Sequence, residues 1–545
     1  MPRMNTNKWR TTWWDFYPFS ALRSVVKKIL LSALLALGAR AAEPTFPFAE
    51  ATIDDLQERM AAGTLTAREL TAAYLARIGD IDMGGPRLNA VIELNPDAMK
   101  IAERLDAERK AGRVRGALHG IPVLIKDNIA TADRMETTAG SLALVGAKPL
   151  RDAPLVVRLR EAGAVILGKT NMSEWAYFRG SRGISGWSAR GGQTRNPYAL
   201  DRNPSGSSSG SAVAVAANLC VVAIGTETNG SIMSPASACG IVGVKPTVGR
   251  VSRTGIIPIS VTQDTAGPMT RTVRDAALVL AAISGPDESD PTTTHSPMGA
   301  AVDLAAPFRS EALRGARVGV LRGPFGFHPR MEAVLEDVVA ALRKAGADVV
   351  DPVKVATLTT FGAQESVLLS YEFKDGVNRY LATLGPDSPI KTLADVIAFN
   401  ESHREQEMPF FGQESLVTAE ARGPLTEQAY LDAREALLRM TRAEGIDATM
   451  DQGKLDVLVM LTRGPAHLTD PVNGDSSSGG SASLAAVAGY PSVTVPAAQV
   501  NGLPVGVSFV GRVWSEAKVL ALAADFEAKV KARREPTFWP TAERR

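Results

Sequence analysis

The chain has 545 residues, of which 45% are hydrophobic and 22% charged, and its formal net charge is only +2. That length allows a large core and suggests about three domains, although α/β enzymes of this size often fold as one unit. The first 41 residues hold seven basic residues and one acidic residue, so the rest of the chain has a net charge of −4. A mildly acidic body argues against a face that binds nucleic acid.

Residues 1–41 have the features of a signal peptide. Lys27 and Lys28 precede an apolar stretch at 29–37, and Ala39-Arg40-Ala41 offers a small-x-small cleavage pattern. The stretch is too short to span a bilayer, so we expect no stable membrane anchor. We therefore expect export from a bacterial cytoplasm to the periplasm, with an uncleaved anchor or a disordered tail as the alternative.

Helices and strands alternate along the rest of the chain. Thr52 begins a helix with two aspartates in its first turn, and Thr66 with Glu69 forms a capping box for a second helix. Further helices are expected at 97–111, 155–161, 330–344 and 515–533, with a mostly helical region at 357–444 and a surface excursion at about 284–305. Strands or buried apolar runs are expected at 88–94, 123–125, 164–167, 241–244, 317–321, 348–350, 455–460, 492–495 and 505–510.

This alternation predicts an α/β fold. We expect a single large domain with a mixed, mostly parallel β-sheet covered by helices on both faces, and we see no internal repeat.

Two serine- and glycine-rich clusters flank an apolar run. They are NPSGSSSGSA at 203–212 and GTETNGSIMSPASACG at 225–240, and the run at 211–225 predicts a buried helix followed by a buried strand. Small residues let backbone N–H groups turn inward and let a hydroxyl approach a substrate. Flexible linkers are the alternative interpretation, but linkers do not usually enclose a core element. We therefore expect the chemistry here.

Several common chemistries find no support. The five histidines are scattered and match no HExxH or CxxC pattern, so no metal site is expected; they are His119, His295, His328, His403 and His467. No G-x-S-x-G elbow indicates a Ser-His-Asp triad. Cys220 and Cys239 lie in apolar surroundings and are expected to be inert thiols, although a disulfide between them stays open.

The string GAVILGKT at 163–170 matches a phosphate-binding pattern letter for letter. Its four middle residues are typical of a strand, whose N–H groups would belong to a sheet and not to a phosphate cradle. Nucleotide binding is therefore not expected.

Serine catalysis with a lysine base remains. A serine hydroxyl needs a base, and a buried lysine whose pKa is lowered can serve as one. Lys126, Lys169 and Lys245 all lie at the ends of expected buried strands, and the residue pattern alone does not choose among them. Each could instead pair with a carboxylate, as Asp127 beside Lys126 suggests.

Three ordered strings resemble the amidase signature family: GIPVLIKDNI at 120–129, GSSSGSAVAVAAN at 206–218 and GTETNGSI at 225–232. The resemblance extends from about residue 52 to GLPVGVSFVGR at 502–512. The strings GTETNGSI and PTVGRVSRTGIIPIS, at 246–260, look most similar to bacterial peptide amidases.

The resemblance implies a catalytic domain at 42–545 that hydrolyses carboxamides through an acyl-enzyme, with C-terminal peptide amides as the expected substrates. By matching motif positions, Lys126 would be the general base and acid, Ser207 the bridging serine after a cis bond from Gly206, and Ser231 the acylated nucleophile. The N–H groups of the residues around the nucleophile would form the oxyanion hole: Thr228, Asn229, Gly230 and Ser231.

The same resemblance implies no cofactor and no obligate protein partner. The expected partner is a small-molecule or peptide amide, with no nucleic acid. A general aliphatic or aromatic amidase is the alternative function, and an amidotransferase A-type subunit is a further one.

Three positions depart from the family pattern. Asn229 replaces a common second glycine, and asparagine is the residue other than glycine that best tolerates φ > 0. Met233 replaces an arginine, which puts a substrate carboxylate contact there in doubt, and Ser205 replaces a glycine without an evident reason. A second serine-rich string, GDSSSGGSAS at 474–483, imitates the first cluster and is expected to be a structural, helix-capping loop beside the pocket.

Overall fold

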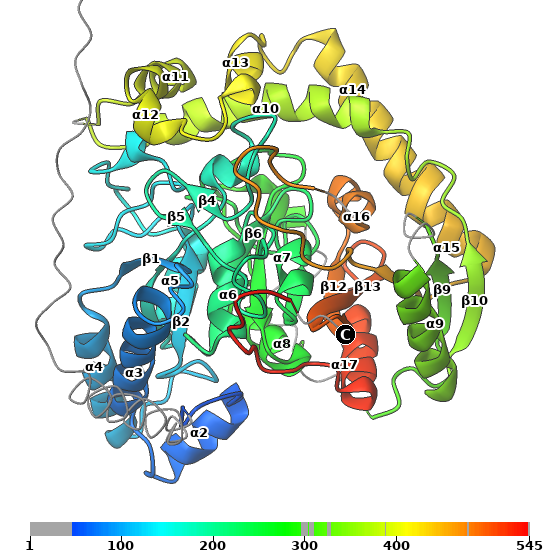
Figure 1. Ribbon diagram of the computed structural model, residues 1–545, viewed down its shortest axis with the longest axis horizontal. Helices are drawn as coiled ribbons and strands as arrows, with labels where there is room; N and C mark the ends of the chain where they lie inside the picture. The colour runs from blue at the N-terminus through cyan, green and yellow to red at the C-terminus, as the bar shows by residue number, and fades with distance from the viewer. Residues whose placement is uncertain are drawn as a thin grey trace, which may run out of the picture. The chain divides into compact units, whose positions relative to one another are not determined.

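A computed structural model describes residues 46–295, 304, 310–323, 329–386, 388–476 and 479–542 of the protein, as shown in Figure 1. The chain divides into two units, Met1–Ala49 and Glu50–Arg545. The expected end of the signal peptide at residue 41 lies outside the described residues, so the signal peptide stays a prediction.

An 11-stranded sheet runs through the Glu50–Arg545 unit in the order β1-β3-β2-β6-β8-β7-β12-β13-β11-β9-β10. A separate two-stranded pair is formed by β4 (Trp187–Ser188) and β5 (Gly192–Gln193). The strands of the large sheet are β1 (Val91–Leu94), β2 (Pro122–Lys126), β3 (Val165–Thr170), β6 (Val222–Glu227), β7 (Val242–Lys245), β8 (Thr265–Thr270), β9 (Arg317–Leu321), β10 (Asp348–Val353), β11 (Val457–Leu461), β12 (Ser492–Val500) and β13 (Leu503–Val510).

The sheet is mixed, as expected, but it is not mostly parallel. Among the ten neighbouring strand pairs described, six are antiparallel and four are parallel. One cause is β8, a central strand that the sequence pattern missed, which pairs antiparallel with both β6 and β7. The other is the hairpin of β12 and β13, which turns at Asn501 and Gly502 with both residues at positive φ.

Helices connect and cover these strands. The helices of the described chain are α2 (Ile53–Ala61), α3 (Ala67–Arg77), α4 (Ala98–Lys110), α5 (Pro154–Glu161), α6 (Ser209–Ala216), α7 (Met233–Ala238), α8 (Val273–Ile283), α9 (Pro329–Lys344), α10 (Gly362–Ala382), α11 (Leu393–Ser402), α12 (Arg404–Glu407), α13 (Glu414–Glu420), α14 (Gln428–Leu438), α15 (Asp447–Gly453), α16 (Ala482–Ala488) and α17 (Glu516–Val530). Short 3₁₀ or π turns are η1 (Ile78–Met83), η2 (Leu142–Leu144), η3 (Glu174–Tyr177), η4 (Pro291–His295) and η5 (Arg439–Ile446).

The two expected helix starts near the N-terminus are confirmed. Thr52 caps α2 together with Asp55, and Thr66 caps α3 together with Glu69, each as a reciprocal capping box. In such a box, two backbone N–H groups that the first helical turn leaves without partners are satisfied by side chains.

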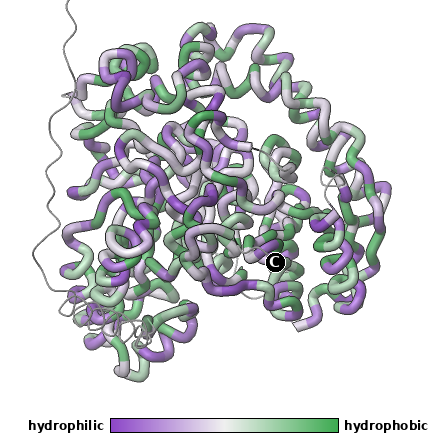
Figure 2. The backbone as a smooth tube through the Cα atoms, in the orientation of Figure 1, coloured by the Kyte–Doolittle hydropathy of each residue, from purple (hydrophilic) through white to green (hydrophobic). Residues whose placement is uncertain are grey.

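Helices pack on both faces of the sheet. α6 packs on β2, β3 and β6 and against α7, whereas α8 packs on β7 and β8 and against α17. The expected helical region at 357–444 is confirmed as α10 to α14, which Figure 1 shows as an arc beside the sheet. Along α10 and α14, Figure 2 shows alternating hydrophobic and hydrophilic stretches. This alternation is typical of helices with one buried face.

The expected surface excursion is only partly external. Residues 284–295 and 304 of it are described. There Asp290 is buried and accepts a hydrogen bond from the backbone N–H of Arg253 at 3.0 Å, so the first part of this stretch packs against the body.

Two local predictions that bear on the site are confirmed. The run between the serine clusters forms α6 and then β6, and every residue of both elements is buried. Residues 165–170 of the phosphate-pattern string form β3, in which Gly168, Lys169 and Thr170 are themselves strand residues. The string therefore contains no phosphate-binding loop.

Candidate active site

Two neighbouring parallel strands bring the expected site residues to one edge of the sheet. β2 ends at Lys126 and β6 ends at Glu227, and Ile125 pairs with Ile224 between them. Parallel strands present their carboxyl ends at the same edge, where α/β proteins usually hold their ligands. This pairing sets Lys126 beside the start of the second serine cluster.

Lys126 lies in a buried hydroxyl-rich environment. Its Nζ is 2.7 Å from Ser207 Oγ, 2.9 Å from Thr226 Oγ1 and 3.3 Å from the Thr226 carbonyl oxygen. The side chain is 0% exposed. Burial lowers the pKa of Lys126 to about 7, against the opposing charges of Asp264 and Glu227. A lysine in this state is neutral in a large fraction of molecules near pH 7 and can accept a proton.

The two other candidate lysines lie in different surroundings. Lys169 donates to the Ile129 carbonyl at 2.6 Å and to Thr137 Oγ1 at 2.8 Å. Lys245 donates to the carbonyl of Pro246 at 3.0 Å. Their pKa values are also lowered by burial, to about 8 in each case. Because neither is hydrogen-bonded to a serine in the described chain, the geometry separates Lys126 from both.

The structure does not show the alternative in which Lys126 forms an ion pair with its neighbour Asp127. Asp127 directs its carboxylate away from its neighbour and contacts Arg190 Nη1 at 3.3 Å. It also accepts from the N–H of Gly140 at 3.2 Å. Asp127 therefore forms a separate buried ion pair.

The first serine cluster meets the second through the backbone. The Ser208 N–H donates to the Ser231 carbonyl at 3.1 Å, and the Ser173 N–H donates to the Ser207 carbonyl at the same distance. The bond between Gly206 and Ser207 is cis, as expected. These contacts bring Ser207 and Ser231 to the wall of a single cavity, where Ser207 is 0% and Ser231 is 8% exposed.

The loop from Thr228 to Ser231 is fixed at both ends. Glu227, which precedes the loop, accepts hydrogen bonds from the N–H groups of Ile232 and Met233, which follow it, at 2.7 and 2.9 Å. At the first residue of the loop, Thr228 Oγ1 donates to Asp264 at 2.5 Å, and burial raises the pKa of Asp264 to about 6. Among the described residues, no bonded acceptor is found for the backbone N–H groups of the four loop residues, Thr228, Asn229, Gly230 and Ser231. Such a set of free donors can stabilise a developing oxyanion.

The turn in this loop is made differently from the expectation. Gly230 takes the positive φ of 83°, whereas Asn229 does not have a positive φ. The Asn229 side chain instead donates to Glu365 at 2.7 Å and accepts from Ser483 Oγ at 3.0 Å. Asparagine here therefore ties the loop to α10 and α16, a role that glycine could not have.

The cavity beside these serines has a volume of about 410 Å³ and a lining of mixed chemistry. Apolar groups in the lining come from Ala176, Tyr177, Phe178, Ile259 and Leu369. Polar groups in it come from Ser185, Arg463, His467, Asp475 and Ser476. The site can therefore hold an apolar side chain and a hydrogen-bonding backbone at once.

Sequence reasoning expected the string at 474–483, which contains Asp475 and Ser476, beside the pocket, but it missed Arg463 and His467. His467 Nε2 is 3.2 Å from Asp475 Oδ1, and Arg463 Nη2 is 3.4 Å from His467 Nδ1. Arg463 follows the predicted strand at 455–460, but nothing in the sequence pairs it with a residue twelve positions later.

The serine-rich look-alike at 474–483 does lie beside the cavity and does precede a helix, α16. Ser481 is at the N-cap of α16, but its side chain makes no capping hydrogen bond and its Oγ contacts the Thr462 carbonyl at 3.3 Å. The expected position of the loop is therefore confirmed, whereas the expected side-chain cap is wrong.

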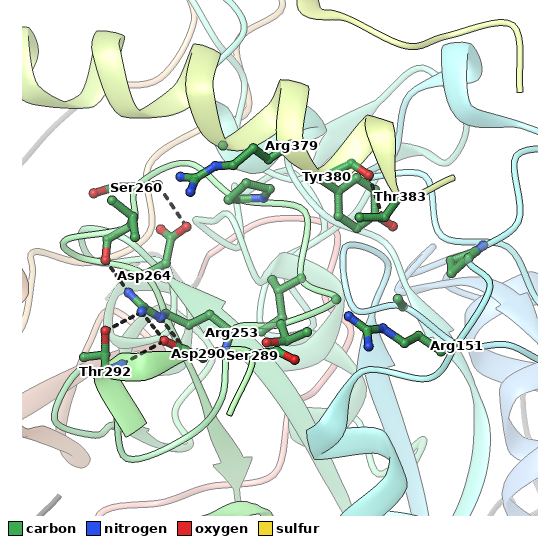
Figure 3. A pocket seen from close by; sticks show the side chains of 18 of the residues that line it. Arg151, Arg253, Ser260, Asp264, Ser289, Asp290, Thr292, Arg379, Tyr380 and Thr383 are labelled. Carbon is green, nitrogen blue, oxygen red and sulfur yellow. Dashed lines mark hydrogen bonds and ion pairs between the residues drawn. The ribbon is translucent and has the colours of Figure 1, made fainter. Parts of the chain in front are cut away.

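A second cavity, of about 750 Å³, is larger and is shown in Figure 3. Arg253 and Asp290 pair on one side of it, and Arg379 and Tyr380 of α10 line another. Lys126, Lys169 and Lys245 line neither cavity, but the smaller cavity is lined by Ser207, whose Oγ is 2.7 Å from Lys126 Nζ. The smaller cavity is therefore the one reached by a hydroxyl that is in contact with a buried lysine.

Other expectations can be compared directly with the described residues. Cys220 and Cys239 are buried free thiols whose pKa values burial raises, to about 12 for Cys220. In the described part of the chain, no group of three or more His, Cys, Asp or Glu side chains could hold a metal ion. Within the same residues, every helix is too short or too polar to cross a membrane.

Comparisons with a protein-family model and with individual proteins agree with one another. A protein-family model described as Amidase matches residues 69–520. The chain is 42% identical to a probable amidase of Arabidopsis thaliana over 505 residues, covering 91% of this chain and 93% of that protein. It is 36% identical to a putative amidase of Schizosaccharomyces pombe over 526 residues, covering 90% of this chain and 87% of that protein.

A solved structure supports the same relationship. The native peptide amidase from Stenotrophomonas maltophilia is 55% identical in sequence and superposes with a TM-score of 0.87. The alignment covers 90% of this chain and 99% of that structure.

Proposed function

The chain belongs to the amidase signature family and is an amide hydrolase, and from this premise we propose that it releases ammonia from the C-terminal carboxamides of peptides. In this proposal Ser231 is the nucleophile, Ser207 bridges, and Lys126 is the general base and acid. The similarity to a peptide amidase supports the substrate class, and the mixture of apolar and polar residues in the cavity lining supports a substrate with both a side chain and a backbone.

One observation carries the assignment of the base. Lys126 Nζ is 2.7 Å from Ser207 Oγ, in fully buried surroundings that lower the lysine pKa to about 7. A base works best when its pKa lies near the working pH, because it must be both available and strong enough.

The first half-reaction forms an ester. Neutral Lys126 takes the proton of Ser207 while Ser207 takes the proton of Ser231, and Ser231 Oγ bonds to the amide carbon. The carbonyl oxygen becomes negative and accepts hydrogen bonds from the N–H groups of the Thr228–Ser231 loop, each typically worth about 3–4 kcal/mol. The proton then returns along the same path to the nitrogen, the C–N bond breaks, and ammonia leaves.

The second half-reaction uses water. Ser231 is now esterified, so the relay from Lys126 through Ser207 removes a proton from a water molecule that attacks the ester carbon. Breaking of the ester bond returns a proton to Ser231 Oγ and releases the carboxylic acid. The enzyme is restored with all its protons in place.

Ammonia release over a panel of amides tests the substrate class. Peptide amides, free amino acid amides and simple carboxamides are compared by kcat/KM, and we expect peptide amides to be at least about tenfold better than simple amides. Equal values for peptide and simple amides would support a general amidase instead. Release from none of the three by the isolated protein would contradict amide hydrolysis without a partner.

We also propose that residues 1–41 direct export to the periplasm and are removed. The basic pair before a short apolar stretch and the small-x-small pattern support this proposal. Cell fractionation and mass spectrometry of the mature N-terminus test it. A cytoplasmic protein that keeps its first 41 residues would contradict it.

A further inference from the structure

Arg463 contributes a buried positive charge to the lining of the cavity. It follows β11, and its backbone bridges to Gly480. The residue is 7% exposed and lines the cavity together with Ser207 and Ser231. A buried guanidinium normally uses its donors fully, since an unpaired one is costly.

One nitrogen of Arg463 is not used. Its Nη2 contacts His467 Nδ1 at 3.4 Å, whereas its buried Nη1 has no hydrogen-bond partner among the described residues. Burial lowers the pKa of Arg463 and the charge of Asp475 opposes this, but an arginine stays charged at any working pH. The guanidinium of this cavity-lining residue thus has one buried donor without an acceptor among the described residues.

The neighbouring carboxylate is occupied by other donors. Asp475 accepts from the Ser185 N–H at 3.1 Å, from Asn203 Nδ2 at 3.2 Å and from His467 Nε2 at 3.2 Å. His467 lies between the two charged groups, with Nε2 3.2 Å from Asp475 Oδ1 and Nδ1 3.4 Å from Arg463 Nη2. Asp475 therefore has little capacity left for a substrate cation, whereas Arg463 retains a donor for a substrate acceptor.

We propose that Arg463 determines specificity by binding the carbonyl oxygen that precedes the C-terminal residue of the substrate, so that N-acylated amides are selected over free amino acid amides. An N-acylated residue presents that oxygen as an acceptor. A free amino acid amide presents an ammonium group in its place, which a buried guanidinium repels. This inference deepens the proposed function and rests on it.

Three substrates with one side chain test the proposal: N-acetyl-leucine amide, leucine amide and 4-methylpentanamide, which lacks the α-nitrogen. In Arg463→Met we expect kcat/KM for the acetylated amide to fall by about 10- to 100-fold, the range for a hydrogen bond to a charged group. For 4-methylpentanamide we expect a change below about threefold, and for leucine amide no loss or a gain. Arg463→Lys keeps the positive charge on a shorter side chain. Its kcat/KM for the acetylated amide should lie between the values of wild type and Arg463→Met.

Arg113→Met is the matched control, because Arg113 is exposed and lies outside the cavity. It should leave all three kcat/KM values within about twofold of wild type. The ratio of acetylated to unacylated substrate is the decisive readout, since a purely structural role would lower all three values together. If Arg463→Met is too unstable to purify, the same ratio in Arg463→Lys decides.

An unchanged ratio, or an equal loss on all three substrates, would overturn the role of Arg463. The proposed function would be overturned by a different result, namely equal kcat/KM values of the wild-type enzyme for 4-methylpentanamide and the acetylated amide. The two failures are therefore distinguishable within one experiment.

Discussion

Residues 206–212 (GSSSGSA) and residues 475–482 (DSSSGGSA) are nearly the same string, and the first serine of each, Ser207 and Ser476, lines the same cavity. Their surroundings differ. Ser207 is fully buried and 2.7 Å from Lys126 Nζ, whereas Ser476 is exposed. In this chain, the difference between the proposed bridging serine and a serine of the cavity wall is therefore the contact with Lys126 at the end of β2, and not the serine-rich string.

The neighbouring serines reinforce this contrast. In the first string, Ser208, Ser209 and Ser211 are buried, and their hydroxyls donate to backbone carbonyls at 3.0, 2.6 and 3.2 Å. These bonds tie the start of α6 to β6 and to the preceding loop. Ser207 is thereby held by its neighbours, which is how a reacting group is kept in a productive geometry.

Replacing the first serine of each string should give the largest contrast. We expect Ser207→Ala to lower kcat/KM by about 10³-fold or more, because the proton path from Lys126 to Ser231 is broken. Ser476→Ala should stay within about threefold of wild type. Steady-state ammonia release by the two purified variants measures both. Similar losses in the two would mean that the strings do not differ in role.

The pH dependence of kcat/KM should reveal the pKa of Lys126, which contacts the first string and not the second. Because the Lys126 pKa is lowered to about 7 and catalysis needs its neutral form, kcat/KM should rise with pH and level off above about pH 8. Below pH 7 it should fall tenfold per unit, to about one hundredth of the plateau at pH 5. An acid limb near pH 4 would assign the base to a carboxyl group, and a limb near pH 10 would mean an unperturbed lysine.

Replacing one glycine of each string by alanine should change the free energy of unfolding by different amounts. A Cβ on Gly210 would lie 2.3 Å from the Ala90 carbonyl oxygen and 2.5 Å from that of Asn171, and backbone atoms cannot easily move. We expect Gly210→Ala to lower the free energy of unfolding by about 1–3 kcal/mol. A Cβ on Gly480 would meet only the Thr462 carbonyl, at 3.9 Å, so Gly480→Ala should change it by less than about 0.5 kcal/mol.

Denaturant unfolding of the two glycine variants, beside wild type, measures these changes. Equal stabilities of Gly210→Ala and Gly480→Ala would contradict the close packing of α6 against the loop after β3.

The smallest expected effect is at Ser483, which directly follows the second string and contacts the Thr228–Ser231 loop. Ser483→Ala removes the hydrogen bond to Asn229 Oδ1, leaving Asn229 held by Glu365 alone. We expect a loss of about 1 kcal/mol in stability and less than about fivefold in kcat/KM. Thermal unfolding and steady-state kinetics check the two values. A loss as large as that of Ser207→Ala would make the second string part of the catalytic unit.

Sequence patterns predicted the elements that carry strong local signals. The capping boxes at Thr52 and Thr66, the buried run of α6 and β6, and the strand that ends at Lys126 all have clear periodicity or end signals. In contrast, β8 reads Thr-Ala-Gly-Pro-Met-Thr, which lacks the β-branched apolar pattern that marks a central strand. Missing β8 led to the mistaken expectation of mostly parallel pairing.

The antiparallel hairpin of β12 and β13 was not predicted, although the sequence contains a signal for it. Asn501 and Gly502 lie between the two apolar runs of β12 and β13, and an Asn-Gly pair in that position predicts a tight hairpin. Among the polar residues of the cavity lining, Asp475 lies in a string that was expected beside the pocket, whereas Arg463 and His467 had no signal. The three residues come together only in the folded chain. Likewise, residue types alone left Lys126, Lys169 and Lys245 equivalent. The family resemblance selected Lys126, and the three-dimensional surroundings separate it from the other two.

Covalent labelling tests the central claim most directly. The mature protein is treated with a fluorophosphonate, which forms a stable bond to an activated serine, and the modified peptide is identified by mass spectrometry. We predict one phosphonylated residue, Ser231, with labelling that is strongly slowed in Lys126→Met and unchanged in Ser476→Ala. Modification of Ser476, Ser481 or any other serine in place of Ser231 would contradict the account.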